Sequence, residues 1–228
     1  MKYYLLPLWI LLGAFHSFSQ DVIFVNDDAI GNGSGTSWEN ANRSLLNAIS
    51  TTQPNSEIWI AEGTYYPGCR NCSPVNRNST FRLRDGIRLY GGFQGWENDK
   101  NERVLVDSTG LYLYQTILSG DIGLPRDTSD NSYHVVRIQG TSSNTFDATL
   151  DGLIIESGRA TLVNDPLGDN ASAIGAGIFS IWTNLTLSHC HIRDNLALKE
   201  GGGLTLFKGE VCINNSIFED NFADAGGG

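Results

Sequence analysis

Seven charged side chains in the second half of the sequence are of the types that cleave polysaccharides. Hydrolysis of a glycosidic bond uses two carboxylates at a separation set by the stereochemistry of the reaction. Elimination from an acidic sugar uses an Arg or Lys that removes a proton, together with a cation such as Ca²⁺ that neutralises the sugar carboxylate. The side chains available for these reactions are Asp151, Glu156, Arg159, Arg193, Asp194, Glu219 and Asp220.

Most of these side chains recur at a fixed interval, which favours a structural role. An internal repeat places Glu156, Arg193 and Glu219 in one column of alternating charge and sets Asp194 over Asp220. A surface ion-pair ladder of this kind contributes roughly 0–1 kcal/mol per pair. Because a catalytic residue is needed only once, we predict no catalytic residue in this segment. A single non-repeated cluster of Asp, His and Arg or Lys in a groove would favour an enzyme instead.

Two stretches offer metal ligands, and each has a simpler explanation. In "HCH", His189 and His191 lie on one side of a strand, ~7 Å apart, with no third ligand in the repeat, so we expect solvent-facing histidines. The Gly-rich stretch 26–35 offers Ca²⁺ oxygen atoms but lacks the spacing of a calcium loop and equally suits turns. Its four oxygen-bearing side chains are Asn26, Asp27, Asp28 and Asn32. We predict no cofactor, with Ca²⁺ at this loop as the alternative.

Four cysteines fall into two groups. Cys69 and Cys72, in "GCRNC", lie on a polar loop where a structural disulfide would close a small ring; free thiols and a redox pair are the alternatives. The repeat places Cys190 on an inward position and Cys212 on an outward one. We therefore expect these two not to bridge, and Cys190 to be a small core residue.

Aromatic residues crowd the N-terminal half of the chain. Some of them must fill the core, but adjacent Tyr65 and Tyr66 cannot both point inward from one strand. Exposed rings on a flat β surface would suit contact with a sugar or a protein. The nine rings are Trp38, Trp59, Tyr65, Tyr66, Tyr90, Phe93, Trp96, Tyr112 and Tyr114.

Composition and the first 20 residues predict an exported protein. Residues 1–20 have one Lys, an apolar run and then small polar residues, which is typical of a secretory signal peptide and too short to span a bilayer. The chain has a formal net charge of −10 and no Lys/Arg cluster. We therefore expect no nucleic-acid partner and no docking on an anionic membrane. No later stretch resembles a transmembrane helix.

The elements that must position these side chains are short strands stacked in a repeat. The segment from Gly175 aligns with the segment from Gly201 at an offset of 26, and residues 148–160 align with the first of these at an offset of 37. The 11 extra residues lie within 161–173 and read as a surface loop. Apolar residues alternate in short runs that cannot be buried within one repeat. Stacking the repeats ~4.8 Å apart pairs each strand with its counterpart and lines up like side chains.

This stacking predicts an all-β, right-handed parallel β-helix with ladders of identical residues. Asn195 over Asn221 forms an asparagine ladder at a corner, where Asn also tolerates a left-handed backbone. Glycines occupy corners at which a Cβ would clash. The predicted ladder and corner residues are Asn195, Asn221, Asp194, Asp220, Gly201, Gly202, Gly203, Gly226, Gly227 and Gly228. Because Gly228 completes a corner whose next strand is missing, we expect the chain to be a fragment.

The N-terminal half is predicted to begin the solenoid. A helix over 42–50, with Leu45, Leu46 and Ile49 on one face, would cover the open apolar end of the first coil. The strand beginning at Glu57 would start the solenoid.

Several stretches then resemble one group of bacterial surface proteins. "FVNDDAIGNGSGTSWENA", "TFRLRDGIRLYGGFQGWE" and the "DN.A…GGG" repeats resemble exported right-handed parallel β-helix proteins related to the polymorphic outer membrane protein repeats. "FEDN" (218–221) fits the F-x-x-N motif of that group, and "IRDN" (192–195) departs from it by Ile for Phe. The resemblance implies an N-terminal cap and first coils over 21–133 and repeated coils over 134–228. It also implies a C-terminal sorting or anchoring domain, which this sequence lacks.

The function predicted from these features is structural or adhesive. We expect a secreted or cell-surface stalk that displays binding surfaces, with a glycan or a host or cell-surface protein as partner. The alternative is a polysaccharide lyase or glycoside hydrolase of the parallel β-helix type that acts on acidic polysaccharide.

Overall fold

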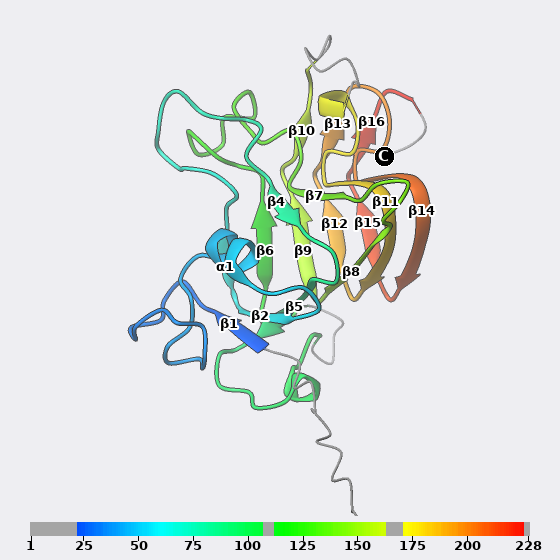
Figure 1. The fold of residues 1–228 in the computed structure, drawn as a ribbon. Helices are drawn as coiled ribbons and strands as arrows, with labels where there is room; N and C mark the ends of the chain where they lie inside the picture. Colours follow the sequence, from blue (N-terminus) through cyan, green and yellow to red (C-terminus); the bar gives the residue numbers. More distant parts are fainter. Residues whose placement is uncertain (1–21, 107–111, 163–170, 226–228) are drawn as a thin grey trace, which may run out of the picture.

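The predicted repeat corresponds to strands that pair in parallel with strands one coil away. A computed structural model describes residues 22–106, 112–162 and 171–225. Every pairing between its named strands is parallel, and the strands of each sheet come from well-separated parts of the chain. The predicted parallel β-helix is confirmed (Figure 1). The predicted signal peptide, residues 1–20, lies outside the described residues.

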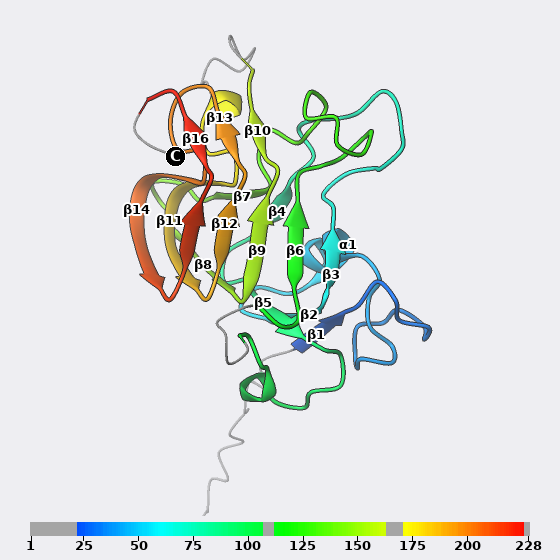
Figure 2. The ribbon, with the colours of Figure 1, turned by 180° about the vertical axis from the view of Figure 1, so that it is seen from behind.

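The chain lays down its strands in three sheets. The largest contains, in order, β1 (Val22–Val25), β2 (Glu57–Ala61), β5 (Arg88–Phe93), β8 (Phe146–Asp151), β11 (Ile178–Ser188), β7 (Val136–Gln139) and β4 (Phe81–Leu83), with β14 (Leu204–Asn214) paired to β11. The second contains β15 (Ile217–Glu219), β12 (His191–Arg193), β9 (Leu153–Glu156), β6 (Thr116–Ser119) and β3 (Gly63–Tyr65). The third contains β10 (Arg159–Ala160), β13 (Leu196–Ala197) and β16 (Phe222–Ala223). The second sheet is seen face-on in Figure 2.

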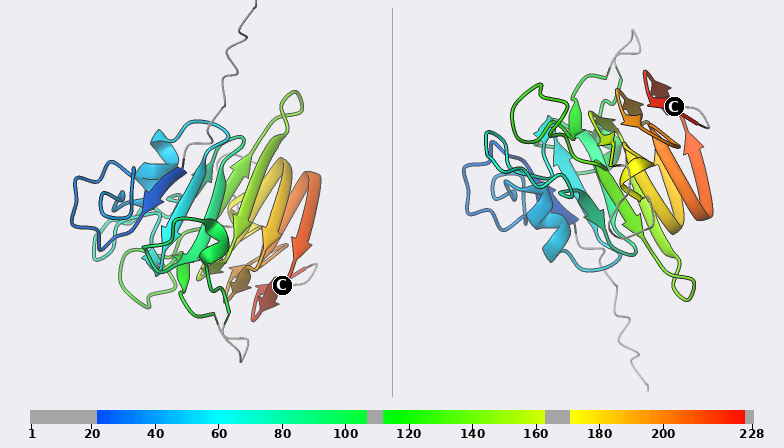
Figure 3. Two further views of the ribbon diagram at one scale, coloured as in Figure 1. Left: turned by 90° about the horizontal axis from the view of Figure 1, so that it is seen from below. Right: turned by 90° about the horizontal axis from the view of Figure 1, so that it is seen from above.

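The strand registers reproduce the sequence repeat. Leu187 pairs with Leu150 of the preceding coil and with Ile213 of the following coil, at the offsets of 37 and 26. Strand β10 pairs with β13 at an offset of 37, whereas the next strand, β11, pairs with β14 at an offset of 26. The extra residues therefore lie in the predicted loop, of which residues 163–170 are outside the described part. The coils follow one another along a single axis, from the blue end to the red end in Figure 3.

The core consists of apolar columns that run along this axis. One column contains Ile58, Leu89, Leu150 and Leu187, which are register partners in successive coils and are fully buried. Each such side chain contributes roughly 1.5–3 kcal/mol through burial. Cys190 lies in the same core, as expected from its inward position.

Three columns of left-handed residues make the corners. Gly152, His189 and Asn215 form one of them, and a second is formed by Trp182 and Lys208. The third consists of Ser157, Asp194 and Asp220. The left-handed backbone expected at Asn195 and Asn221 is found instead at the Asp residues before them, because the Asn side chains are turned into the coil stack. Asn195 Nδ2 donates to Asn221 Oδ1 over 3.0 Å.

Glycines allow the closest backbone contacts at these corners. A Cβ on Gly202 would lie 2.2 Å from the carbonyl oxygen of Phe222, and Gly201 has a φ of +58°. At Gly203 a Cβ would meet the side chains of Phe218 and Asn221 at about 3.0 Å. Gly226, Gly227 and Gly228 lie outside the described residues.

The N-terminal cap differs from the prediction in two details. Helix α1 (Leu45–Thr51) begins three residues late, because the Ser44 side chain accepts from the backbone N–H of Asn47 and so acts as the N-cap. The helix packs against β1, β2 and β4, and buries Leu45, Ala48 and Ile49. Leu46 was wrongly placed on this face and is 41% exposed.

The solenoid also starts earlier than expected. Strand β1 precedes the predicted first strand and pairs in parallel with β2 at the edge of the large sheet. Two short 3₁₀ turns, η1 (Lys100–Glu102) and η2 (Ala171–Ala173), lie in connections. Across the described ranges, no helix has the length and apolar character needed to cross a membrane.

Candidate functional site

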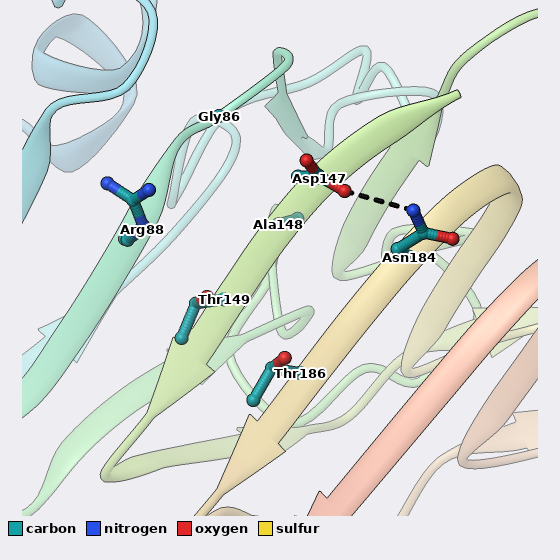
Figure 4. A pocket seen from close by; sticks show the side chains of 7 residues that line it. All are labelled: Gly86, Arg88, Asp147, Ala148, Thr149, Asn184 and Thr186. Carbon is teal, nitrogen blue, oxygen red and sulfur yellow. Dashed lines mark hydrogen bonds between the residues drawn. The ribbon is translucent and has the colours of Figure 1, made fainter. Parts of the chain in front are cut away.

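A polar groove lies on the outer face of β5, β8 and β11 (Figure 4). Its volume is about 270 Å³. The groove crosses three coils, so it depends on their stacking. Its lining residues are Gly86, Arg88, Asp147, Ala148, Thr149, Asn184 and Thr186.

Strand alternation turns the polar side chains of the groove outward. In β8, Ala148 and Leu150 are buried, whereas Asp147 is exposed and Thr149 is half-buried. The parallel register then aligns Arg88, Thr149 and Thr186 in one row across the coils. A second row contains Asp147 and Asn184. Neighbouring members of a row are ~4.8 Å apart at the backbone.

Hydrogen bonds hold the charged members of the groove in place. Asn184 Nδ2 donates to Asp147 Oδ1 over 3.0 Å, and this contact is the dashed line in Figure 4. The Arg88 guanidinium donates to the backbone carbonyl of Asn55 over 3.2 Å. The groove therefore presents a fixed cation, two hydroxyl groups and a carboxylate–amide pair. This set can exchange hydrogen bonds with a ligand rich in hydroxyl groups.

Sequence reasoning missed this groove. Arg88, Asp147 and Asn184 belong to none of the predicted site sets. The outward polar positions of "FDATLD" and "NLTLS" were a usable signal. The row that joins them to Arg88 spans 61 residues between Arg88 and Thr149 and depends on the coil register.

The predicted charge ladder exists in register but not as a continuous set of ion pairs. Arg193 Nη2 lies 2.8 Å from Glu156 Oε2. Glu219 is the register partner of Arg193, but its Oε2 lies 2.9 Å from His191 Nε2. His191 therefore takes the carboxylate that was expected to extend the ladder.

Within the described part of the chain, Asp151 lies in a group that resembles the non-repeated cluster described above. Its Oδ1 is 3.3 Å from an Arg103 nitrogen and 3.6 Å from His189 Nδ1. His189 Nε2 lies 3.2 Å from the Asn215 amide nitrogen, so both ring nitrogens face protein groups. The cluster connects side chains of three coils at a corner and shares no residue with the lining of the groove. Arg103, which comes from the connection after β5, was not predicted.

The histidines do not share a site. His189 sits in a left-handed corner before β12, so strand alternation does not place it beside His191. His191 stacks on Tyr112, with ring centroids 6.1 Å apart. Burial, together with Cys190 and Asp151, raises the pKa of Tyr112 to about 12. Within the described ranges, no three His, Cys, Asp or Glu side chains are grouped as metal ligands.

The remaining charged candidates lie at a corner or in the strand that follows it. Arg159 donates to the backbone carbonyl of Asp194 over 2.8 Å, and burial lowers the pKa of Arg159. Asp194 and Asp220 are exposed at their left-handed corners.

The loop considered for Ca²⁺ uses its oxygen atoms in turns. Asn26 Oδ1 accepts from the N–H of Asp28 over 3.0 Å, and Asn32 Oδ1 accepts from Ser34 over 2.9 Å. These are side-chain-to-backbone bonds two residues along, which is the geometry of Asx turns. Burial and the neighbouring Asp28 raise the pKa of Asp27.

The cysteines are free thiols in this structure. A hydrogen bond with Cys69 raises the pKa of Cys72, so the two side chains are neighbours. Their disulfide stays a prediction. Cys212 is exposed and is the register partner of Thr186 on the next strand.

Most of the aromatic rings are covered. Trp59, Tyr90 and Phe93 form a buried cluster on the outer face of the large sheet, with Trp38 packed against it. Tyr65 is buried and Tyr66 is half-buried, as their alternation requires. Tyr112 and Tyr114 are half-buried as well. Of the nine rings only Trp96, at 59%, is well exposed.

No family model, curated protein or solved structure matches this chain. The resemblance to bacterial surface β-helix proteins therefore stays a prediction. The functional argument depends on the groove and on the fold that positions it.

Proposed function

We propose that this chain is a binding or display module of a secreted or cell-surface protein, and that its outer groove binds a carbohydrate. The observation that carries the proposal is the groove itself. One groove of about 270 Å³ is lined by Arg88, two threonine hydroxyls and the Asp147–Asn184 pair. Adjacent sugar hydroxyls are matched by carboxylate, amide and guanidinium groups of this kind.

The stacked coils favour binding because they fix the lining residues before a ligand arrives. Strands β5, β8 and β11 are hydrogen-bonded neighbours, so the groove loses little conformational entropy when a ligand binds. Its hydrogen bonds are exposed to solvent, and each contributes about 0.5–1.5 kcal/mol net. Four or five such bonds correspond to dissociation constants that range from roughly tens of millimolar to a few micromolar.

A glycan array with the purified chain tests this function. Asn184→Ala and Thr186→Val remove groups that line the groove, and we expect each to weaken binding at least fivefold in titration calorimetry. Thr145→Val is the matched control, because Thr145 is exposed and outside the groove. Equal binding by all four proteins would overturn the carbohydrate site. A host or cell-surface protein captured through the same residues would keep the adhesive role with a different partner.

Export is part of the proposal. The signal-peptide pattern of residues 1–20 supports secretion, and fractionation of expressing bacteria is the direct measurement. Retention of the uncleaved chain in the cytoplasm would contradict it.

Cleavage of a glycan in the same groove is the second candidate function. Glu210 is the register partner of Asn184 on β14, so Asp147 and Glu210 flank Asn184 at two strand spacings, roughly 9.6 Å at the backbone. Inverting glycosidases separate their carboxyl groups by about 6.5–9.5 Å. A depolymerisation screen on acidic polysaccharides tests this candidate. Asp147→Asn would abolish cleavage if Asp147 acts as an acid or base; if the groove only binds, neither the parent chain nor the variant depolymerises the polysaccharide.

A further inference from the structure

A second hollow, with a mainly apolar wall, lies between α1 and β4. Its volume is about 260 Å³, and it shares no residue with the polar groove. Its lining residues are Leu46, Ile49 and Ser50 of α1, Arg82 of β4, and Arg84 just after β4.

The apolar wall comes from the side of α1 that does not face the core. Leu45 and Ala48 are buried in the solenoid, and Leu46 is left partly in water. A single exposed Leu is common and needs no explanation. Here, however, Leu46 borders a concave surface together with the edge of Ile49, so a side chain inserted there would lose contact with water on several sides.

Guanidinium groups stand beside this apolar wall. Arg82 is exposed in the middle of β4, and its register partner on β7 is Arg137. Arg84 donates to the carbonyl of Ile49 over 3.1 Å and to that of Thr52, so its head group is held at the end of α1.

The positive charge beside this hollow contrasts with the net negative charge of the chain. It has 25 acidic and 15 basic residues, yet Arg82, Arg84 and Arg137 lie on two neighbouring strand segments. An anionic partner is therefore attracted to this surface and repelled by most of the rest.

We propose that this hollow docks an acidic peptide segment of a partner protein. One apolar side chain of the segment rests on Leu46 and Ile49, and its flanking carboxylates pair with Arg82 and Arg84. An extended peptide turns residues i, i+2 and i+4 to one side, ~6.8 Å apart, so an apolar residue at i+2 with acidic residues at i and i+4 presents all three side chains to the hollow.

Fluorescence anisotropy with a labelled peptide tests the site. The probe is fluorescein-Gly-Gly-Asp-Ser-Leu-Ser-Asp-amide, and its controls replace Asp-Ser-Leu-Ser-Asp by Asp-Ser-Ser-Ser-Asp or Lys-Ser-Leu-Ser-Lys. We expect the probe to bind, and each control peptide to bind at least tenfold more weakly. Arg82→Gln and Leu46→Gln should each weaken binding of the probe at least fivefold. Arg126→Gln, which removes an equal charge from an exposed residue outside the hollow, should not change binding.

Several outcomes would overturn the proposal. Equal binding of the Asp-Ser-Ser-Ser-Asp peptide would show charge attraction without insertion. Binding of sodium octanoate at this site, with no peptide binding, would identify a small amphiphile instead of a peptide. Thermal unfolding of Arg82→Gln and Leu46→Gln checks that both variants fold. Arg84 is left intact because it holds the α1 carbonyls, and the carbohydrate experiment is independent because its residues lie elsewhere.

Discussion

Asn195 shows how one side chain can connect three coils. Its Oδ1 accepts from the N–H of Gly158 over 2.8 Å, and its Nδ2 donates to the carbonyl of Ile155 over 3.0 Å, both in the preceding coil. Toward the following coil it donates to Asn221. The side chain is fully buried, so these bonds replace water that cannot reach the backbone groups.

Asn195→Ala should therefore destabilise the solenoid strongly. The change leaves buried backbone groups of the preceding coil without partners, and each such group costs about 1–3 kcal/mol. We expect a loss of about 3 kcal/mol in the free energy of unfolding, measured by urea denaturation. Asn221→Ala is the matched control and should cost less, because Asn221 is only half-buried. Equal losses would contradict the role of burial.

Cys190 makes the free energy of unfolding decrease at alkaline pH. Burial raises the pKa of its thiol from its ordinary value of 9.0 to about 12. In the unfolded chain the thiol loses its proton first, so its contribution is complete below pH 9 and is lost as the pH rises toward 12. The slope is about 1.4 kcal/mol per pH unit for one proton.

The measurement is the free energy of unfolding at pH 8, 9, 10 and 11 for the parent chain and Cys190→Ala. The variant should start lower, because it loses packing, and should fall less steeply above pH 9. Cys212→Ala is the control and should keep the parent slope, because Cys212 is exposed. Parallel curves for all three proteins would refute the assignment.

At the scale of elements, hydrogen bonds hold residues 94–97 directly after β5 in place. The buried Glu97 carboxylate accepts from the N–H groups of Gln94, Gly95 and Trp96 over 2.7–3.0 Å. The carbonyl of Glu97 accepts from the Trp38 indole over 2.8 Å. This connection covers the aromatic cluster on the outer face and carries Arg103 to Asp151.

Glu97→Gln should loosen this connection without unfolding the coils. The amide nitrogen cannot accept, so at least one backbone N–H loses its partner, and charge-assisted bonds become neutral ones. We expect a loss of about 2 kcal/mol and faster hydrogen exchange in 94–105, while exchange in β9 and β12 stays unchanged. Glu39→Gln, at an exposed position, is the control. Uniformly faster exchange would indicate global destabilisation instead.

At the scale of the whole molecule, the two ends of the solenoid differ. Helix α1 places Leu45, Ala48 and Ile49 in the core at one end. At the other end, large apolar side chains on β14, β15 and β16 are 37–53% exposed. They are Phe207, Val211, Ile213, Ile217, Phe218 and Phe222.

An added coil should stabilise the molecule by covering these side chains. A second copy of residues 201–225 is inserted after Ala225, with one spacer residue before it. The copy is one residue shorter than the repeat, so the spacer restores the offset of 26. We expect the melting temperature to rise, since stability in solenoids grows with each stacked interface. The control carries the same insert with its inward residues, equivalent to Val211 and Ile213, changed to Ser. An equal or lower melting temperature for the apolar insert would contradict stacking.

Local pattern was sufficient to predict the coils. Alternation of apolar residues identified the strands around Leu150, Leu187 and Ile213, and the offsets of 37 and 26 set their register. The alternation is visible over a few neighbouring residues, and the offsets come from comparing the sequence with itself. Neither signal requires knowledge of a contact between distant residues. The helix was also found, although its start was set by the Ser44 side chain and not by the apolar period.

The sites depend on neighbours that are distant in sequence. The groove forms because Arg88 and Thr149 meet across two coils, and Arg103 reaches Asp151 from a connection with no repeat. Leu46 and Arg82 line a hollow only because α1 packs beside β4. Periodicity along the chain reports which side of a strand a residue faces. It does not report what stands next to that side chain, because lateral neighbours are chosen by coil stacking and by the path of irregular connections.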